Sequence, residues 1–91
     1  MAAKKKVFRI IGNIRTEDVL SVVQEISPYA FGEKTNRLLI TPRKQDKGKP
    51  ADKVKFQYIQ IDFTDLQRAR KCHYAVKHLL VKDSSDFLQL L

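Results

Sequence analysis

The sequence predicts an α+β domain with the element order β-α-β-β-α-β. Segments rich in β-branched and aromatic residues alternate along the chain with segments whose apolar residues recur at helical spacing. The length is 91 residues, which is enough for one domain and leaves little room for a second. We therefore expect one four-stranded antiparallel sheet that carries two helices on one face.

The first half of the chain is expected to form a strand, a helix and a second strand. Val7–Ile14 is apolar on both sides, as is typical of a central strand. Thr16, followed by two acidic residues, predicts a helix start, and the apolar residues that follow make one helical face. Pro28 is expected to end this helix, because the residue before a proline avoids the helical conformation. A short strand over Arg37–Thr41 follows.

The second half contains the clearest strand, Val54–Phe63. Side chains alternate along it between an apolar core face and an open face. Thr64–Gln67 matches a capping box, with Thr64 as the cap, and opens a second amphipathic helix. Phe87–Leu91 is a candidate for a last short strand. The open face of the third strand is expected to carry Phe56, Tyr58 and Gln60.

This order of elements, with both helices amphipathic, is that of the ferredoxin-like arrangement, βαββαβ. We expect residues 1–6 to form a basic N-terminal arm and residues 7–91 to form the single folded domain. In the first strand we expect Phe8 and Ile10 to face the core and Arg9 to lie on the open face. The opposite register would bury an unpaired guanidinium, which is costly.

The net charge of +8 is large for a chain of this length. It favours an anionic partner, for which nucleic acid is the first candidate, and an anionic membrane surface or an acidic protein also fits. Residues 43–55, RKQDKGKPADKVK, carry six basic and two acidic side chains. Gly48 and Pro50 at their centre predict a flexible basic hairpin loop between the second and third strands.

Other chemistries find little support in the sequence. The single cysteine, Cys72, falls on an apolar helical stripe and is expected to be a buried, inert thiol. His73 and His78 do not have the spacing of a metal-binding pair, and the three glycines are scattered, so we expect no metal, cofactor, small-molecule substrate or catalytic residues. Without a disulfide framework or an apolar run near the ~18 residues of a membrane span, we expect a cytoplasmic or nuclear protein.

The segment Tyr58–Cys72, YIQIDFTDLQRARKC, resembles the third strand and second helix of the RNA recognition motif family. Ile11–Ile14 resembles the end of the family's first-strand motif. The resemblance covers nearly the whole chain as topology and about 15 residues as motif. It implies RNA binding, with Tyr58 at one of the family's two base-stacking positions in the third strand. Gln60, which is not aromatic, falls at the other position. It describes a variant motif whose aromatic set is incomplete.

Physical reasoning supports the same expectation, because single-stranded nucleic acid is held by aromatic faces and by cations that follow its backbone. We expect Phe56 and Tyr58 to stack on bases, and Arg9, Gln60 and Gln89 to hydrogen-bond to bases or phosphates. The backbone contacts are expected to come from the basic loop: Arg43, Lys44, Lys47, Lys49, Lys53 and Lys55. In the alternative interpretation, the two aromatics pack under the loop or under a C-terminal tail, and the lysines of the loop are only solvated.

Three functions therefore remain in view. The leading hypothesis is an RNA-binding or ribonucleoprotein-assembly domain that contacts single-stranded RNA. The second is a protein–protein interaction module of the same fold in a larger ribonucleoprotein or regulatory complex. The third is a structural ribonucleoprotein subunit with no preference for single strands. The basic residues of the second helix, which suggest a position inside a larger RNA particle, are Arg68, Arg70, Lys71, Lys77 and Lys82.

Overall fold

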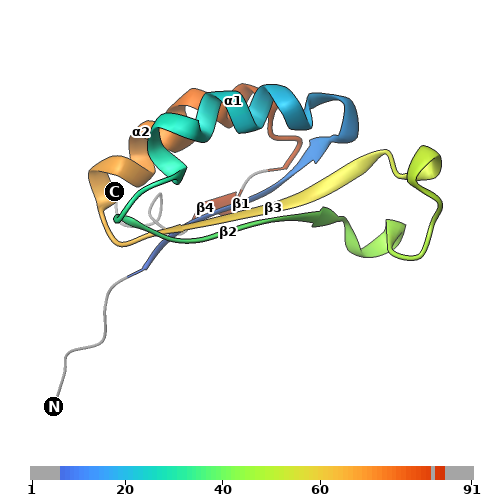
Figure 1. Cartoon of the computed structure of the whole chain (residues 1–91), viewed down its shortest axis with the longest axis horizontal. Helices are drawn as coiled ribbons and strands as arrows, with labels where there is room; N and C mark the ends of the chain where they lie inside the picture. The colour runs from blue at the N-terminus through green and yellow to red at the C-terminus, as the bar shows by residue number, and fades with distance from the viewer. Residues whose placement is uncertain (1–6, 83, 86–91) are drawn as a thin grey trace, which may run out of the picture.

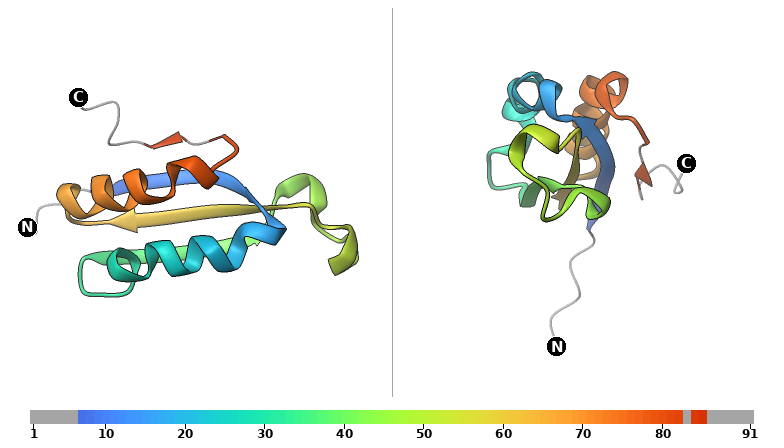
Figure 2. Two further views of the ribbon diagram at one scale, coloured as in Figure 1. Left: turned by 90° about the horizontal axis from the view of Figure 1, so that it is seen from above. Right: turned by 90° about the vertical axis from the view of Figure 1, so that its right-hand side faces the viewer.

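The computed structural model describes residues 7–82 and 84–85 and shows two helices side by side on one face of an antiparallel sheet (Figure 1). The elements follow one another as the sequence predicts. They are β1 (Phe8–Arg15), α1 (Val19–Ala30), β2 (Thr35–Pro42), β3 (Phe56–Phe63), α2 (Leu66–Val76) and β4 (Ser84–Ser85). One layer of helix on one layer of sheet leaves the other face of the sheet without a helix, as Figure 2 shows from above and from the end.

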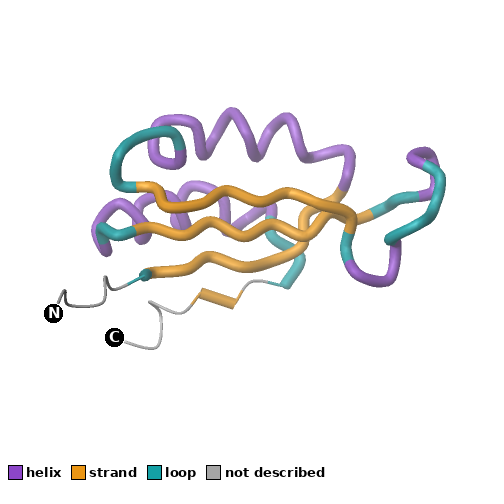
Figure 3. Tube along the Cα trace, turned by 60° about the horizontal axis from the view of Figure 1, so that its bottom comes forward, coloured by secondary structure: helices purple, strands orange, loops and turns teal. Residues whose placement is uncertain are grey.

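The strand order is β2-β3-β1-β4, with every neighbouring pair antiparallel. With the two crossover helices, this is the ferredoxin-like topology. Three strands of eight residues make up nearly all of the sheet, and β4 contributes only Ser84 and Ser85, which pair with Ile11 and Ile10 (Figure 3). The prediction of a four-stranded sheet is therefore confirmed only in part. The candidate strand Phe87–Leu91 lies outside the described residues.

The core lies between the sheet and the helices. Phe8 and Ile10 of β1 are buried there, and Ile10 pairs with Ile61 of the central strand β3. Arg9 falls on the opposite face, as expected from the cost of burying a guanidinium. The remaining buried apolar side chains of this cluster are Ile14, Val22, Ile26, Ala30, Ile59, Phe63, Ala69, Cys72 and Val76.

The first helix departs from the prediction at both ends. A 3₁₀ turn over residues 16–18 precedes α1, and the Thr16 hydroxyl does not cap the helix. It donates instead to the carbonyl of Val54, with 2.8 Å between the oxygens. Pro28 does not end the helix, which continues to Ala30. A proline in the last turn removes only one backbone hydrogen bond, and burial of Ala30 in the core holds that turn in place.

The second helix is capped one residue later than predicted. Asp65 is the N-cap, and its carboxylate accepts hydrogen bonds from the backbone N–H groups of Gln67 and Arg68, at 2.9 and 3.3 Å. The Thr64 hydroxyl donates to the carbonyl of Lys34. Either a carboxylate or a hydroxyl can accept from the free N–H groups of the first turn. The negative charge of the carboxylate also interacts favourably with the helix dipole, and a neutral hydroxyl lacks this charge.

Arg68 of α2 holds the end of α1. Its Nε donates to the carbonyl of Tyr29, and its Nη2 lies 3.3 Å from the carbonyl of Pro28. These carbonyls belong to the last turn of α1, where backbone acceptors lack helical partners and a cation is favoured. Arg68 is therefore a structural residue rather than part of an outer basic face. It is a second reason why the helix continues past Pro28.

In residues 7–82 and 84–85, no helix has the length and apolar character that crossing a membrane requires. The same residues contain no cluster of three or more His, Cys, Asp or Glu side chains that could hold a metal ion.

Candidate nucleic-acid interface

The face of the sheet that carries no helix is the candidate interface. β3 places Phe56, Tyr58, Gln60 and Asp62 on it, because alternate side chains of a strand point to the same side. The adjacent strands contribute the residues that pair with these four. Those partners are Arg9, Ile11, Asn13 and Arg15 of β1, and Arg37, Leu39 and Thr41 of β2.

A chain of hydrogen bonds runs along β3 on this face. The Tyr58 hydroxyl lies 2.7 Å from Oε1 of Gln60, and Nε2 of Gln60 lies 3.2 and 3.4 Å from the two carboxylate oxygens of Asp62. Across the strand pair, Arg9 donates to the same carboxylate from Nε and Nη2, at 2.8 and 3.3 Å. Gln60 and Asp62 are only 8% and 6% exposed.

This chain gives two of the predicted site residues a role inside the protein. The polar groups of Arg9 and Gln60 are engaged by Asp62 and Tyr58, and Asp62 balances the charge of the arginine. The alternation of β3 placed Asp62 on the same face as Arg9, which was the signal for this pair in the sequence. The pairing itself depends on the register between β1 and β3.

Phe56 lies under the first residue of the loop. The guanidinium carbon of Arg43 is 4.5 Å from the centre of the Phe56 ring, which is the geometry of a cation–π contact. Nε of Arg43 also donates to Oδ2 of Asp46 at 2.8 Å. One face of Phe56 is therefore covered by the loop, as the alternative interpretation of this aromatic expected.

Tyr58 lines a groove beside the loop. The groove has a volume of about 280 Å³, close to the lower end of the ~300–1,000 Å³ that is typical of small-molecule sites. Of the predicted site residues, the groove brings together Lys44 and Lys47 of the loop and Tyr58 of β3. Its other walls are Leu39, Thr41 and Pro42.

The loop of residues 43–55 is folded around Asp46 and is not the flexible hairpin that the sequence predicted. Lys44–Asp46 and Ala51–Lys53 form 3₁₀ turns, and the Asp46 side chain is 1% exposed. Its carboxylate accepts from Nζ of Lys49 at 3.0 Å and from Nε of Arg43. The hydrogen bond from Lys49, and then that from Arg43, hold the pKa of Asp46 below its usual value of 3.8.

Gly48 makes this compact loop possible. Its φ angle is 88°, in the left-handed region that side chains with a Cβ disfavour. The chain reverses at this residue, which lies between the two 3₁₀ turns. The loop projects beyond the end of the sheet, on the right in Figure 1.

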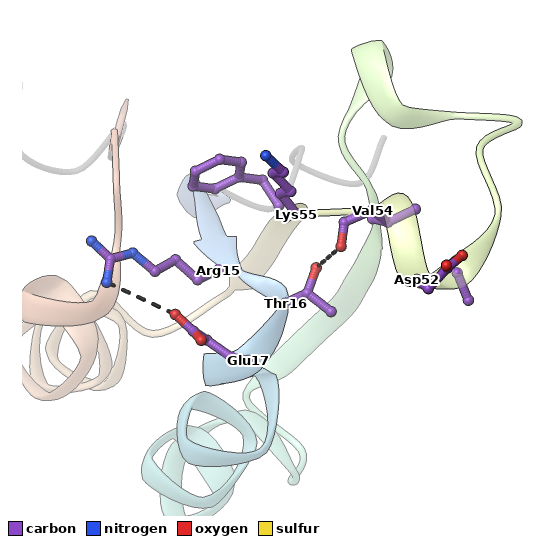
Figure 4. Close-up of a pocket in the computed structure, with 8 residues that line it drawn as sticks. Arg15, Thr16, Glu17, Asp52, Val54 and Lys55 are labelled. Atoms are coloured by element: carbon purple, nitrogen blue, oxygen red, sulfur yellow. Dashed lines mark hydrogen bonds and ion pairs between the residues drawn. The ribbon is translucent and has the colours of Figure 1, made fainter.

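A second cavity, of about 530 Å³, lies where the loop returns to the sheet (Figure 4). Arg15 and Glu17 approach each other at 4.0 Å on one side, and Asp52 and Lys55 lie on the other. The charges here are mixed, so this cavity is a poorer site for a polyanion than the Tyr58 groove. Lys55 therefore stands apart from Lys44 and Lys47, and Lys53 is exposed to solvent.

Two predicted features lie elsewhere. Gln89 lies outside the described residues. Lys71 and Tyr74 lie on the exposed side of α2, and Lys77 directly follows this helix, with its Nζ 4.9 Å from the centre of the Tyr74 ring. The Cys72 thiol is fully buried, and desolvation raises its pKa to about 12 although the charge of Arg68 lowers it. The prediction of a buried thiol is confirmed.

No protein-family model and no curated protein matches the sequence. Among solved structures, the chain is similar to a dimeric ferredoxin-like protein of unknown function from Thermobifida fusca YX. The two share 15% sequence identity over 93% of this chain and 92% of that chain, with a TM-score of 0.45.

Proposed function

We propose that this domain binds single-stranded RNA, as a component of a ribonucleoprotein, in the groove between Tyr58 and the basic loop. The observation that supports the proposal is that one aromatic wall and two lysines line the same groove. Aromatic rings stack on bases of any sequence, and lysines attract the phosphates beside them. Tyr58 is assigned to a base, and Lys44 and Lys47 are assigned to the backbone.

The order of the loop adds to this proposal. Asp46 and Gly48 give the loop a defined shape, so Lys44 and Lys47 are positioned before a ligand arrives. A preordered site loses less conformational entropy on binding than a flexible one. Arg43 and Lys49 serve mainly to order the loop in this scheme, because each is already paired with Asp46.

A chemical-shift titration of the isotopically labelled protein with a short single-stranded RNA tests the proposal. We expect the largest changes at the amides of Leu39, Thr41, Lys44, Lys47 and Tyr58. A duplex of the same sequence should cause smaller changes, because its bases are stacked and paired. Changes confined to the exposed side of α2, or no changes at all, would contradict the assignment of the groove.

A further inference from the structure

The hydrogen-bond chain on the open face has a direction, and Asp62 sets it. A carboxylate can only accept hydrogen bonds. Asp62 accepts two of them from Arg9, at 2.8 and 3.3 Å. The Gln60 group that faces Asp62 must therefore be the NH₂ group, which lies 3.2 Å from Oδ2. The amide carbonyl of Gln60 is then left to face the opposite way along β3.

The same reasoning orients the hydroxyl of Tyr58. The Gln60 carbonyl is an acceptor only, and it lies 2.7 Å from the Tyr58 oxygen, so Tyr58 must be the donor of this hydrogen bond. A phenol has one proton, and this bond uses it. Gln60 is 8% exposed and held from both ends, so its amide has little freedom to reverse. The Tyr58 oxygen therefore has only lone pairs to offer a ligand.

The other polar groups of the groove differ in this respect. Lys44 and Lys47 are donors only. The Thr41 hydroxyl donates to the carbonyl of Pro42 over 3.4 Å, which is a long hydrogen bond. Among the side chains that line the groove, the Tyr58 oxygen is thus the one that the hydrogen-bond chain along β3 restricts to accepting. A base held against this groove is selected by the donor that it presents to Tyr58.

We propose that Tyr58 makes the groove selective for adenine and cytosine, whose amino group stands at the edge position where uracil carries O4, over uracil; this rests on the RNA-binding function proposed above. The amino groups at N6 of adenine and N4 of cytosine are donors, whereas O4 at the corresponding edge of uracil is an acceptor. The single N–H of uracil lies between two carbonyl oxygens, whose lone pairs would face those of Tyr58. Stacking on the Tyr58 ring holds a base of any kind, and a neighbouring base that lies edge-on to the Tyr58 oxygen is discriminated by the hydrogen bond that it donates.

The test compares two RNAs that differ by the amino group alone. The first is an octamer of adenosine, and the second is the same octamer built from purine ribonucleoside, which lacks the 6-amino group. Fluorescence anisotropy gives their affinities for the wild-type protein and for Tyr58→Phe, which keeps the ring and removes the oxygen. The wild type should bind the second RNA roughly 2- to 10-fold more weakly, the range of one net hydrogen bond. Tyr58→Phe should lose this preference, apart from any difference in stacking.

A second variant tests the direction of the hydrogen-bond chain. Gln60→Met has similar volume but no acceptor, so it releases the Tyr58 proton while the Arg9–Asp62 pair remains. The ratio of affinities for octamers of adenosine and uridine should fall toward one. An unchanged ratio in Gln60→Met, or an amino preference that persists in Tyr58→Phe, would overturn the proposal. If the wild type binds none of these RNAs, the RNA-binding function itself fails and the selectivity falls with it.

Discussion

Removing two positive charges from the Tyr58 groove should reduce the salt dependence of RNA binding more than removing two from α2. The perturbation is Lys44→Gln combined with Lys47→Gln, which lowers the net charge of +8 to +6. Both side chains line the groove, and neither has an ion pair with another described residue. Glutamine keeps the length of the side chain and its ability to hydrogen-bond, so the change is mainly one of charge.

The size of the effect follows from the number of loop cations that remain for RNA. Arg43 and Lys49 are paired with Asp46. The loop lysines that line the groove are Lys44 and Lys47. Each phosphate neutralised on a single strand contributes about 0.7 to the salt slope, so two contacts give a slope of about −1.4. Raising the salt from about 50 to about 200 mM should then weaken wild-type binding about 7-fold. With both contacts removed, the same change should leave the affinity nearly unaltered.

The assay is fluorescence anisotropy with a labelled single-stranded octamer over this range of salt. The matched control is Lys71→Gln combined with Lys77→Gln, which removes the same charge from the exposed side of α2. The control should keep a salt slope close to that of the wild type, because long-range attraction is screened over about 8–10 Å at these salt concentrations. Equal slopes for the two double variants would refute the assignment of phosphate contacts to the groove and would indicate a diffuse attraction.

Five further predictions follow from the contacts. Tyr58→Ala should weaken RNA binding by about 1–3 kcal/mol in an anisotropy titration, whereas Tyr74→Ala on α2, where the ring is 74% exposed, should leave it unchanged. Asp46→Asn should weaken binding and speed loop amide exchange although it removes a negative charge; tighter binding would show that charge matters more than loop order. Because the pKa of Asp46 is lowered, its ion pairs should persist down to pH 3.8 and be lost as the pH falls through the lower native pKa. Arg68→Leu should lower the free energy of unfolding by about 1.5–3 kcal/mol in urea denaturation, since it leaves the last carbonyls of α1 without their charged donor. Cys72, with a pKa of about 12, should react with a disulfide reagent at pH 8 only as fast as the protein opens, and rapid reaction of the native protein would contradict its burial.

The sequence was most informative where alternation or periodicity spans a whole element. The pattern of β3 separates Ile59, Ile61 and Phe63 on the core side from Tyr58 and its neighbours on the open side, and the structure confirms this division. A shift by one residue would turn Gln60 and Asp62 into the core and expose the isoleucines, so this register is strongly determined. The position of Tyr58 beside the basic loop could also be predicted, since the loop directly precedes the strand, whereas the groove between them could not.

The sequence was least informative where a long-range contact outweighs a local preference. Pro28 is a strong local signal for a helix end, but the hydrogen bonds that support the last turn of α1 come from Arg68, 40 residues away. The choice between Thr64 and Asp65 as the cap depends on a competing acceptor, the carbonyl of Lys34. In the loop, the basic residues around Gly48 and Pro50 suggested a flexible hairpin, and the buried position of Asp46 among them was not apparent from composition.

Arg43 makes contact with the sheet and the loop at the same time, through the Phe56 ring and the Asp46 carboxylate. A base that stacks on this side of Phe56 must displace the guanidinium and with it a hydrogen bond that orders the loop. Stacking of a base on Phe56 therefore disfavours the ordered loop. By thermodynamic linkage, the ordered loop disfavours stacking on Phe56 by the same free energy. Conversely, an anion that withdraws Arg43 from Asp46 uncovers an aromatic face at the end of β3. The contact of Arg43 thus has two alternative states. In one the loop is ordered and the Phe56 ring is covered, and in the other the ring is a second stacking surface and the loop loses this support.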